Sequence, residues 1–67
     1  MDKKLIKLYE VPKNSRIRIE GLEVNGVLTE ELNFHHVDGM YSYCTTDDDE
    51  IVHIAAFAEC EIIEQNK

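Results

Sequence analysis

Two dipeptides constrain the fold of this chain most: Asn25-Gly26 and Asp38-Gly39, each lying between short runs of apolar residues or of alternating apolar and polar residues. Asn-Gly and Asp-Gly are preferred at the centre of the tight turns that join antiparallel strands, where positive φ angles are required. The run at 16–20 (RIRIE) alternates cleanly and places Ile17 and Ile19 on one face. This pattern predicts short antiparallel strands joined by hairpins.

The rest of the chain continues the same pattern. The apolar or alternating runs are residues 3–11, 16–20, 22–24, 27–28, 32–37, 40–46, 51–57 and a short closing run around 61–63. Polar residues 47–50 predict a third turn. With Asp38-Gly39 as the turn of the second hairpin, we expect His36 to face Tyr41 and Phe34 to face Tyr43 across the strands.

The chain of 67 residues has room for one hydrophobic core, so we expect a single β domain over 1–67. Its 43% hydrophobic content is too high for a disordered chain. We predict an all-β fold, either a small five- to six-stranded barrel or a rolled antiparallel sheet. The predicted core consists of Leu5, Leu8, Ile17, Ile19, Leu22, Val24, Leu32, Phe34, Val52, Ile54 and Ile62.

The C-terminal third also contains good helix formers, at residues 54–64. We expect a single 3₁₀ turn near 56–59 in preference to a continuous helix. A strand at Ile51–Ala55, such a turn, and a closing strand at Cys60–Ile63 resemble the end of an SH3-like barrel. The resemblance covers about fifteen residues and does not extend to a groove for proline-rich ligands, because the chain has no tryptophan. In length, acidity and β patterning the whole chain is also similar to small proteins encoded by phages.

Charge is distributed very unevenly along the chain. The first eighteen residues hold six basic and two acidic residues, a balance of +4, and the remaining forty-nine hold one basic and twelve acidic residues, a balance of −11. The total is −7. A field of this sign attracts basic proteins and repels nucleic acid and says little about the fold.

Residue types that bind zinc are present, namely His35, His36, His53, Cys44 and Cys60. Their spacing lacks the close pairs typical of zinc sites, so we expect no metal and no other cofactor, with both cysteines acting as small buried apolar residues. No nucleophile motif accompanies the histidines, so we expect no enzymatic activity and no catalytic residue. The start of the chain lacks the apolar run of a secretion signal and no segment is long enough to span a membrane, which favours a cytoplasmic protein with reduced thiols.

The candidate site for a protein partner combines the acidic run Asp47, Asp48, Asp49 and Glu50 with Tyr41 and Tyr43. Tyrosine is enriched among the residues that dominate binding energy at interfaces. Two other interpretations of the acidic run remain open, a solvated hairpin tip and a weak calcium loop. The alternative interpretation of the tyrosines is packing within the core or the sheet.

Three functions are consistent with this pattern. We expect first a non-enzymatic interaction module that binds a basic protein, for example a phage-encoded inhibitor or accessory factor in the host cytoplasm. The alternative is a nucleic-acid accessory module that contacts phosphates through Lys13, Arg16 and Arg18, although the net charge makes nucleic acid an unfavourable partner. The third is a structural subunit of a symmetric homo-oligomer that pairs edge strands between copies.

Overall fold

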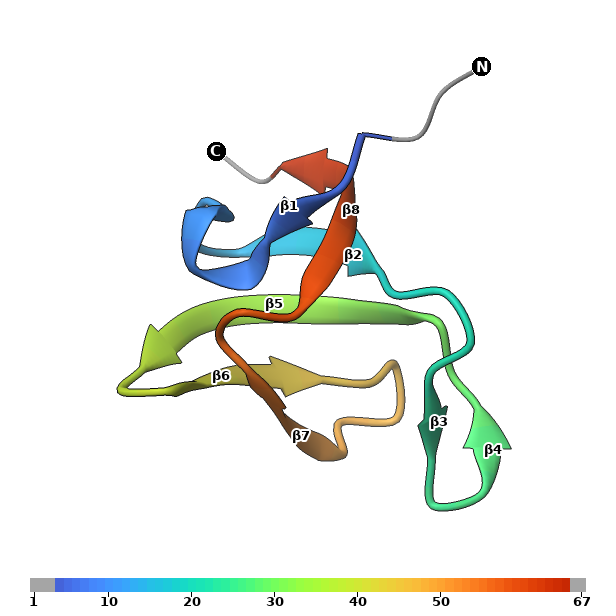
Figure 1. The fold of residues 1–67 in the computed structure, drawn as a ribbon. Helices are drawn as coiled ribbons and strands as arrows, with labels where there is room; N and C mark the ends of the chain where they lie inside the picture. Colours follow the sequence, from blue (N-terminus) through green and yellow to red (C-terminus); the bar gives the residue numbers. More distant parts are fainter. Residues whose placement is uncertain (1–3, 66–67) are drawn as a thin grey trace.

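The computed structural model describes residues 4–65 of the chain, and it is built almost entirely from strands (Figure 1). The elements are β1 (Ile6–Lys7), a 3₁₀ turn η1 (Leu8–Glu10), β2 (Ser15–Arg18), β3 (Glu23–Val24), β4 (Val27–Leu28), β5 (Glu31–Asp38), β6 (Tyr41–Thr45), β7 (Ile51–Ala55) and β8 (Glu59–Gln65). Six of the strands form an antiparallel sheet in the order β1-β8-β2-β5-β6-β7, and β3 pairs with β4 in a separate hairpin. The prediction of an all-β fold is confirmed.

The sheet curves around the core but does not close into a barrel, so the rolled sheet is the correct one of the two predicted forms. β1 and β7 lie at opposite ends of the strand order and do not pair with each other. The reason is the shortness of β1, which gives way after two residues to η1. The backbone N–H groups of Leu8 and Tyr9 then donate to the carbonyls of Ala58 and Ala56, in the turn between β7 and β8.

The 3₁₀ turn lies at Leu8–Glu10, inside the predicted strand 3–11, and not near 56–59 as predicted. Residues 55–58 form a β-turn instead, with Ala58 N–H donating to the Ala55 carbonyl at 3.0 Å. The position of η1 follows from Leu8 and Val11, which are both buried. Residues three apart point to opposite faces of a strand and to the same side of a 3₁₀ turn, so a straight strand would expose one of them.

Both predicted hairpins are present. Asn25 and Gly26 have φ angles of 53° and 80°, as a turn with two positive φ values requires, and they join β3 to β4. In the second hairpin Asp38 already pairs with Tyr41, so the two turn residues are Gly39 and Met40. Met40 is 71% exposed because it belongs to the turn.

The predicted register of this second hairpin is wrong. His36 pairs with Tyr43 and Phe34 pairs with Cys44, with an irregularity of the ladder between Phe34 and His36. A bulge inserts one residue into a strand and changes which face the following residues occupy. His36 is therefore exposed, and Val37 packs against the core.

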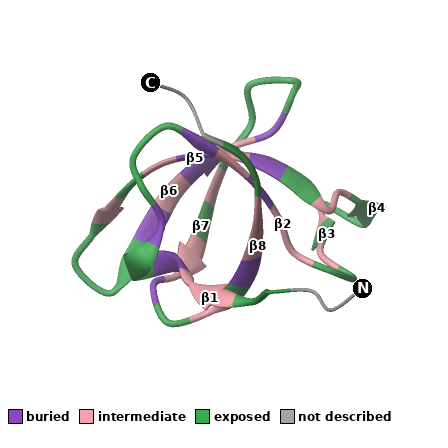
Figure 2. Ribbon diagram, turned by 90° about the horizontal axis from the view of Figure 1, so that it is seen from above, coloured by how far each residue is buried: buried purple, intermediate pink, exposed green. Residues whose placement is uncertain are grey.

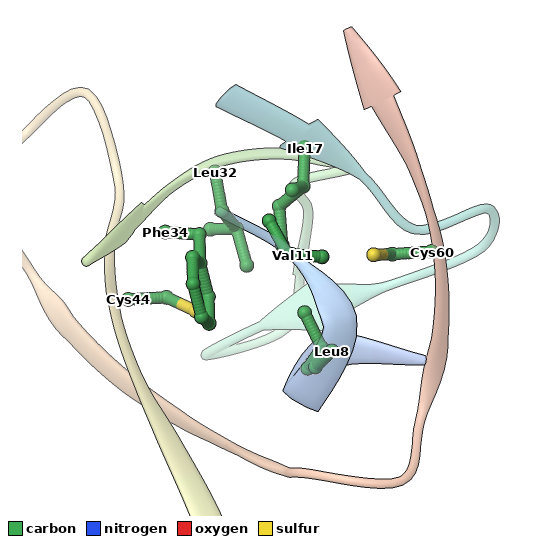
Figure 3. Close-up of a cluster of buried hydrophobic side chains, with 7 residues drawn as sticks. All are labelled: Leu8, Val11, Ile17, Leu32, Phe34, Cys44 and Cys60. Atoms are coloured by element: carbon green, nitrogen blue, oxygen red, sulfur yellow. The ribbon is translucent and has the colours of Figure 1, made fainter. Parts of the chain in front are cut away.

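The core fills the concave side of the sheet (Figure 3). Its buried cluster is Leu8, Val11, Ile17, Leu32, Phe34, Cys44 and Cys60. Four predicted core residues are among these, and five more, Ile19, Leu22, Val52, Ile54 and Ile62, pack against the cluster while half-buried. The prediction that Leu5 belongs to the core is wrong, since Leu5 is 53% exposed ahead of β1. Val24, also predicted in the core, is half-buried outside the cluster. The predicted burial of both cysteines is confirmed, as each is 0% exposed.

Buried residues alternate with more exposed ones along β2, β5 and β6 (Figure 2). The alternation gives this part of the sheet an inner face on the core and an outer face toward solvent. None of the helical segments in the described part of the chain is long and apolar enough to cross a membrane.

Candidate functional site

Strand β6 presents the two candidate tyrosines on the outer face of the sheet. Ser42 and Cys44 point to the core and are 1% and 0% exposed, so the alternating residues Tyr41 and Tyr43 point outward. Tyr41 is 58% exposed, and Tyr43 is half-buried by its neighbours on the adjacent strands. The outer face therefore offers one free aromatic ring and one packed ring on the same strand.

The neighbours of Tyr43 are all three histidines of the chain. His36 on β5 stacks on the Tyr43 ring with centroids 5.4 Å apart and planes at 6°. His35 and His53 approach edge-on, at 5.3 and 5.8 Å. Sequence reasoning paired Tyr43 with Phe34, which lies on the opposite face. It missed the histidines because it placed the turn at Asp38-Gly39, whereas the turn residues are Gly39 and Met40.

Two of the histidines are held by further hydrogen bonds. His35 Nε2 lies 2.8 Å from the hydroxyl of Thr45, and His53 Nδ1 lies 3.3 Å from the carbonyl oxygen of Ser42, to which it can only donate. Aromatic pairs of this kind stabilise a sheet surface. The cluster therefore packs the middle of the outer face with ring contacts and hydrogen bonds.

The arrangement separates the residue types that were considered as zinc ligands. The histidines lie on the outer face, whereas Cys44 and Cys60 are buried free thiols on the inner side. Burial raises the pKa of Cys60 to about 11, and Cys44 adds to that rise; burial also raises the pKa of Cys44. A thiol that stays protonated is a poor nucleophile and a poor metal ligand. Within residues 4–65 no three histidine, cysteine, aspartate or glutamate side chains are grouped to hold a metal ion.

The predicted third turn, which we call the acidic loop (residues 47–50), follows directly after β6 and Thr46. The side chain of Thr46 organises this loop, because its hydroxyl accepts the N–H groups of Asp48 and Glu50 at 3.2 and 3.1 Å. The backbone N–H of Thr46 also donates to the Glu50 carbonyl, and the Thr46 carbonyl accepts from the Asp49 N–H. Asp49 has φ 64°, a conformation that aspartate and asparagine adopt more readily than most residues. The loop is thus held by hydrogen bonds to the side chain and the backbone of Thr46.

The two ends of the acidic loop are also tied to other elements. Both carboxylate oxygens of Asp47 accept from the guanidinium of Arg16 on β2, at 2.9 and 3.1 Å. The hydrogen bond from Arg16 holds the pKa of Asp47 below its ordinary value, and the same bond raises the pKa of Arg16. Glu50 accepts from the Asn25 side chain at 2.9 Å.

The middle of the loop is different from its ends. The side chains of Asp48 and Asp49 are exposed, and within residues 4–65 they take part in no hydrogen bond or ion pair. Two carboxylates are therefore displayed on a loop whose backbone is held in place. Of the four acids singled out in the sequence, these two are available to a partner and the other two anchor the loop.

The arginines of the predicted basic face are paired with acids. Arg16 also contacts Glu31 at 3.2 Å and donates to Asn33 at 2.9 Å. Arg18 contacts Glu30 at 2.7 Å. Lys13 is exposed in the turn before β2, and the two arginines are only partly exposed. The three residues therefore do not form an open cationic strip.

A group of exposed apolar side chains, which sequence reasoning missed, lies beside Tyr41. The residues are Tyr9, Met40 and Phe57, which are 59, 71 and 61% exposed. Backbone hydrogen bonds bring their segments together, since Ala56 N–H donates to the Met40 carbonyl and Tyr9 N–H donates to the Ala56 carbonyl. Tyr41 pairs with Ala55 at the edge of this group. The available sequence signal was the placement of Met and Phe in turns, where polar residues are usual.

No family model, no curated protein and no solved structure matches this chain. The candidate surface is therefore defined by its geometry: the outer face of β6 with Tyr41 and Tyr43, the acidic loop at one end of that strand, and apolar side chains at the other.

Proposed function

We propose that this protein is a non-enzymatic interaction module that binds a basic protein partner through the acidic loop and the tyrosines of β6. The observation that carries the proposal is the state of Asp48 and Asp49, two exposed carboxylates without partners in the described chain, on a loop fixed by Thr46. A carboxylate already paired inside the protein would have to give up that partner in order to bind another.

The fixed loop favours binding because less conformational freedom is lost when the partner docks. The charge of −7 adds long-range attraction for a basic surface and speeds encounter. Tyr41 supplies an exposed aromatic ring at the start of the same strand, of the kind that carries much of the energy at interfaces. Charge would thus bring the partner in, and the aromatic and apolar end would hold it.

The nucleic-acid alternative has less support. Arg16 and Arg18 are already engaged by Asp47, Glu31 and Glu30. A phosphate backbone would have to compete with these carboxylates in the field of a strongly acidic protein.

In its most specific form, the proposal of a protein-binding module is an inhibitor or accessory factor of the phage type that occupies a basic site of a host cytoplasmic protein.

The proposal is tested by affinity capture from a cell lysate, followed by measurement of binding to the captured partner. The test variant is Asp48→Lys with Asp49→Asn, where asparagine is chosen because it tolerates the positive φ at that position. The control is Glu23→Lys with Glu59→Gln, which changes the net charge by the same amount at exposed positions outside the loop.

We expect the loop variant to weaken binding by about tenfold or more and to flatten its salt dependence, whereas the control variant keeps most of the affinity. Equal losses in both variants would mean that only net charge matters. An unchanged affinity in the loop variant would overturn the proposal.

A further inference from the structure

The two edges of the six-stranded sheet are built differently. β1 is two residues long, includes Lys7 and gives way at once to η1. β7 is five residues long, Ile-Val-His-Ile-Ala, without lysine, aspartate, glutamate, proline or glycine. Proteins usually protect an edge strand by shortness, charge, proline or a bulge, because its unpaired backbone groups invite another strand. β1 has two of these protections, and β7 has none.

The direction of the β7 backbone groups follows from its neighbours. The Glu50 carbonyl accepts from Thr46 and the Ala56 N–H donates to Met40, so the even-numbered residues of this strand face β6. Successive residues of a strand direct their N–H and C=O groups to opposite sides. The backbone groups of Ile51, His53 and Ala55 therefore face away from β6, and within residues 4–65 no strand pairs with that side. Figure 1 shows β7 at the border of the sheet with no strand beyond it.

We propose that β7 pairs antiparallel with β7 of a second copy of this chain, about a two-fold axis at His53. In this register Ile51 lies opposite Ala55 of the second copy, and Val52 lies opposite its Ile54. Each outward N–H meets an outward carbonyl; the Ala55 carbonyl, which already accepts from Ala58 N–H in the turn after β7, would take the Ile51 N–H as a second donor. Every cross-strand pair of side chains is apolar except His53 with its own symmetry mate. No carboxylate faces a carboxylate along the shared ladder.

The strand fits a second copy better than a basic segment, because it has no acidic side chain along its length to pair with lysine or arginine. The acidic loops do not oppose the pairing strongly. In the proposed register the two Glu50 residues are separated by six residue steps, about 20 Å at the usual rise of a strand. That distance exceeds the screening length of about 8 Å at physiological ionic strength.

This inference goes beyond the proposed function and does not depend on a basic partner. The two interactions should depend on salt in opposite ways. Self-association strengthens with salt because screening reduces repulsion between two acidic copies, whereas binding to a basic partner weakens with salt.

The first test is sedimentation velocity of the wild-type chain at 10 to 500 µM in low and physiological salt, compared with two variants. His53→Pro removes an outward N–H and leaves the bonds to β6, since proline is tolerated at an edge when its missing donor faces solvent. His53→Ala removes the same side chain and keeps the N–H. We expect the wild type and His53→Ala to dimerise, and His53→Pro to weaken the dimer about 30-fold through its two lost hydrogen bonds.

A wild-type chain that stays monomeric at 500 µM overturns the proposal, as does a dimer that His53→Pro leaves intact. A second measurement needs no variant, in case His53→Pro fails to fold. Amide hydrogen exchange at Ile51 and His53 should slow as protein concentration rises, while exchange at Val52 and Ile54 is slow throughout. Fast exchange at Ile51 and His53 at every concentration contradicts the pairing.

Discussion

The two faces of β5 and β6 are made from alternate residues of the same strands, but they serve different ends. The inner face contributes Phe34 and Cys44, both 0% exposed, to the core. The outer face contributes Tyr43 and two histidines in ring contact, to which β7 adds His53, with Tyr41 left open to solvent. The contrast shows that burial on one side of the sheet supplies the stability, which leaves the side chains of the other side available for recognition.

The largest expected effect is on the inner face. Phe34→Ala removes the largest fully buried side chain, and the lost burial and the cavity should lower the free energy of unfolding by about 3–5 kcal/mol. A domain of this size gains little more than that from its whole core, so the variant should be largely unfolded. Leu28→Ala, at a 62% exposed position, is the control and should unfold with the wild type in a thermal melt. Equal melting of all three would contradict the assignment of the faces.

A smaller effect is expected where the outer face joins the acidic loop. Thr46→Ala leaves the N–H groups of Asp48 and Glu50 without their acceptor, which should cost about 2 kcal/mol in urea denaturation. Thr46→Ser keeps the hydroxyl and should recover most of the loss. If serine were no better than alanine, the hydroxyl would not be what holds the loop.

Within the outer face, the two tyrosines should differ. Tyr43→Ala loses three ring contacts and should cost about 1 kcal/mol of stability, whereas Tyr41→Ala, at an exposed position, should leave stability nearly unchanged. Both substitutions should weaken partner binding. Equal stability of the two variants, measured in one denaturation series, would mean that the histidines do not support Tyr43.

The smallest effect concerns the ion pair that ties the loop to β2. Because Arg16 lowers the pKa of Asp47, the pair stabilises the fold above the ordinary pKa of an aspartate, and this contribution disappears as pH falls through the lowered value. Arg16→Gln should return the pKa of Asp47 to its ordinary range in a carboxyl NMR titration. Arg18→Gln, which removes the contact with Glu30, should leave it lowered. A pKa unchanged by Arg16→Gln would rule out the pair as the cause.

The sequence predicted the features that depend on neighbouring residues. Both hairpins and the burial of the two cysteines follow from turn dipeptides and residue type. The register of the second hairpin was not predictable, because its turn lies at Gly39-Met40, one residue later than the Asp-Gly dipeptide indicates. The bulge at His35, which no glycine marks, then shifts the register again by one residue. The 3₁₀ turn at Leu8–Glu10 was hidden in an apolar run that is equally typical of a strand.

The candidate site was only partly predictable, for a related reason. The acids and tyrosines were identifiable by type, but the pairing of Arg16 with Asp47 joins residues 31 positions apart. That contact depends on the strand order β2-β5-β6 in the sheet, which no local sequence pattern indicates. Which acids remain available to a partner therefore became visible only in the folded chain.

The most direct test of the proposed surface is an amide NMR map of the isotope-labelled protein before and after addition of the captured partner. We expect the largest changes in amide chemical shift at Tyr41, Tyr43 and the acidic loop, with β1 and β8 unaffected. Shifts concentrated on β1 and β8, with the signals of Asp48 and Asp49 unmoved, would contradict this expectation.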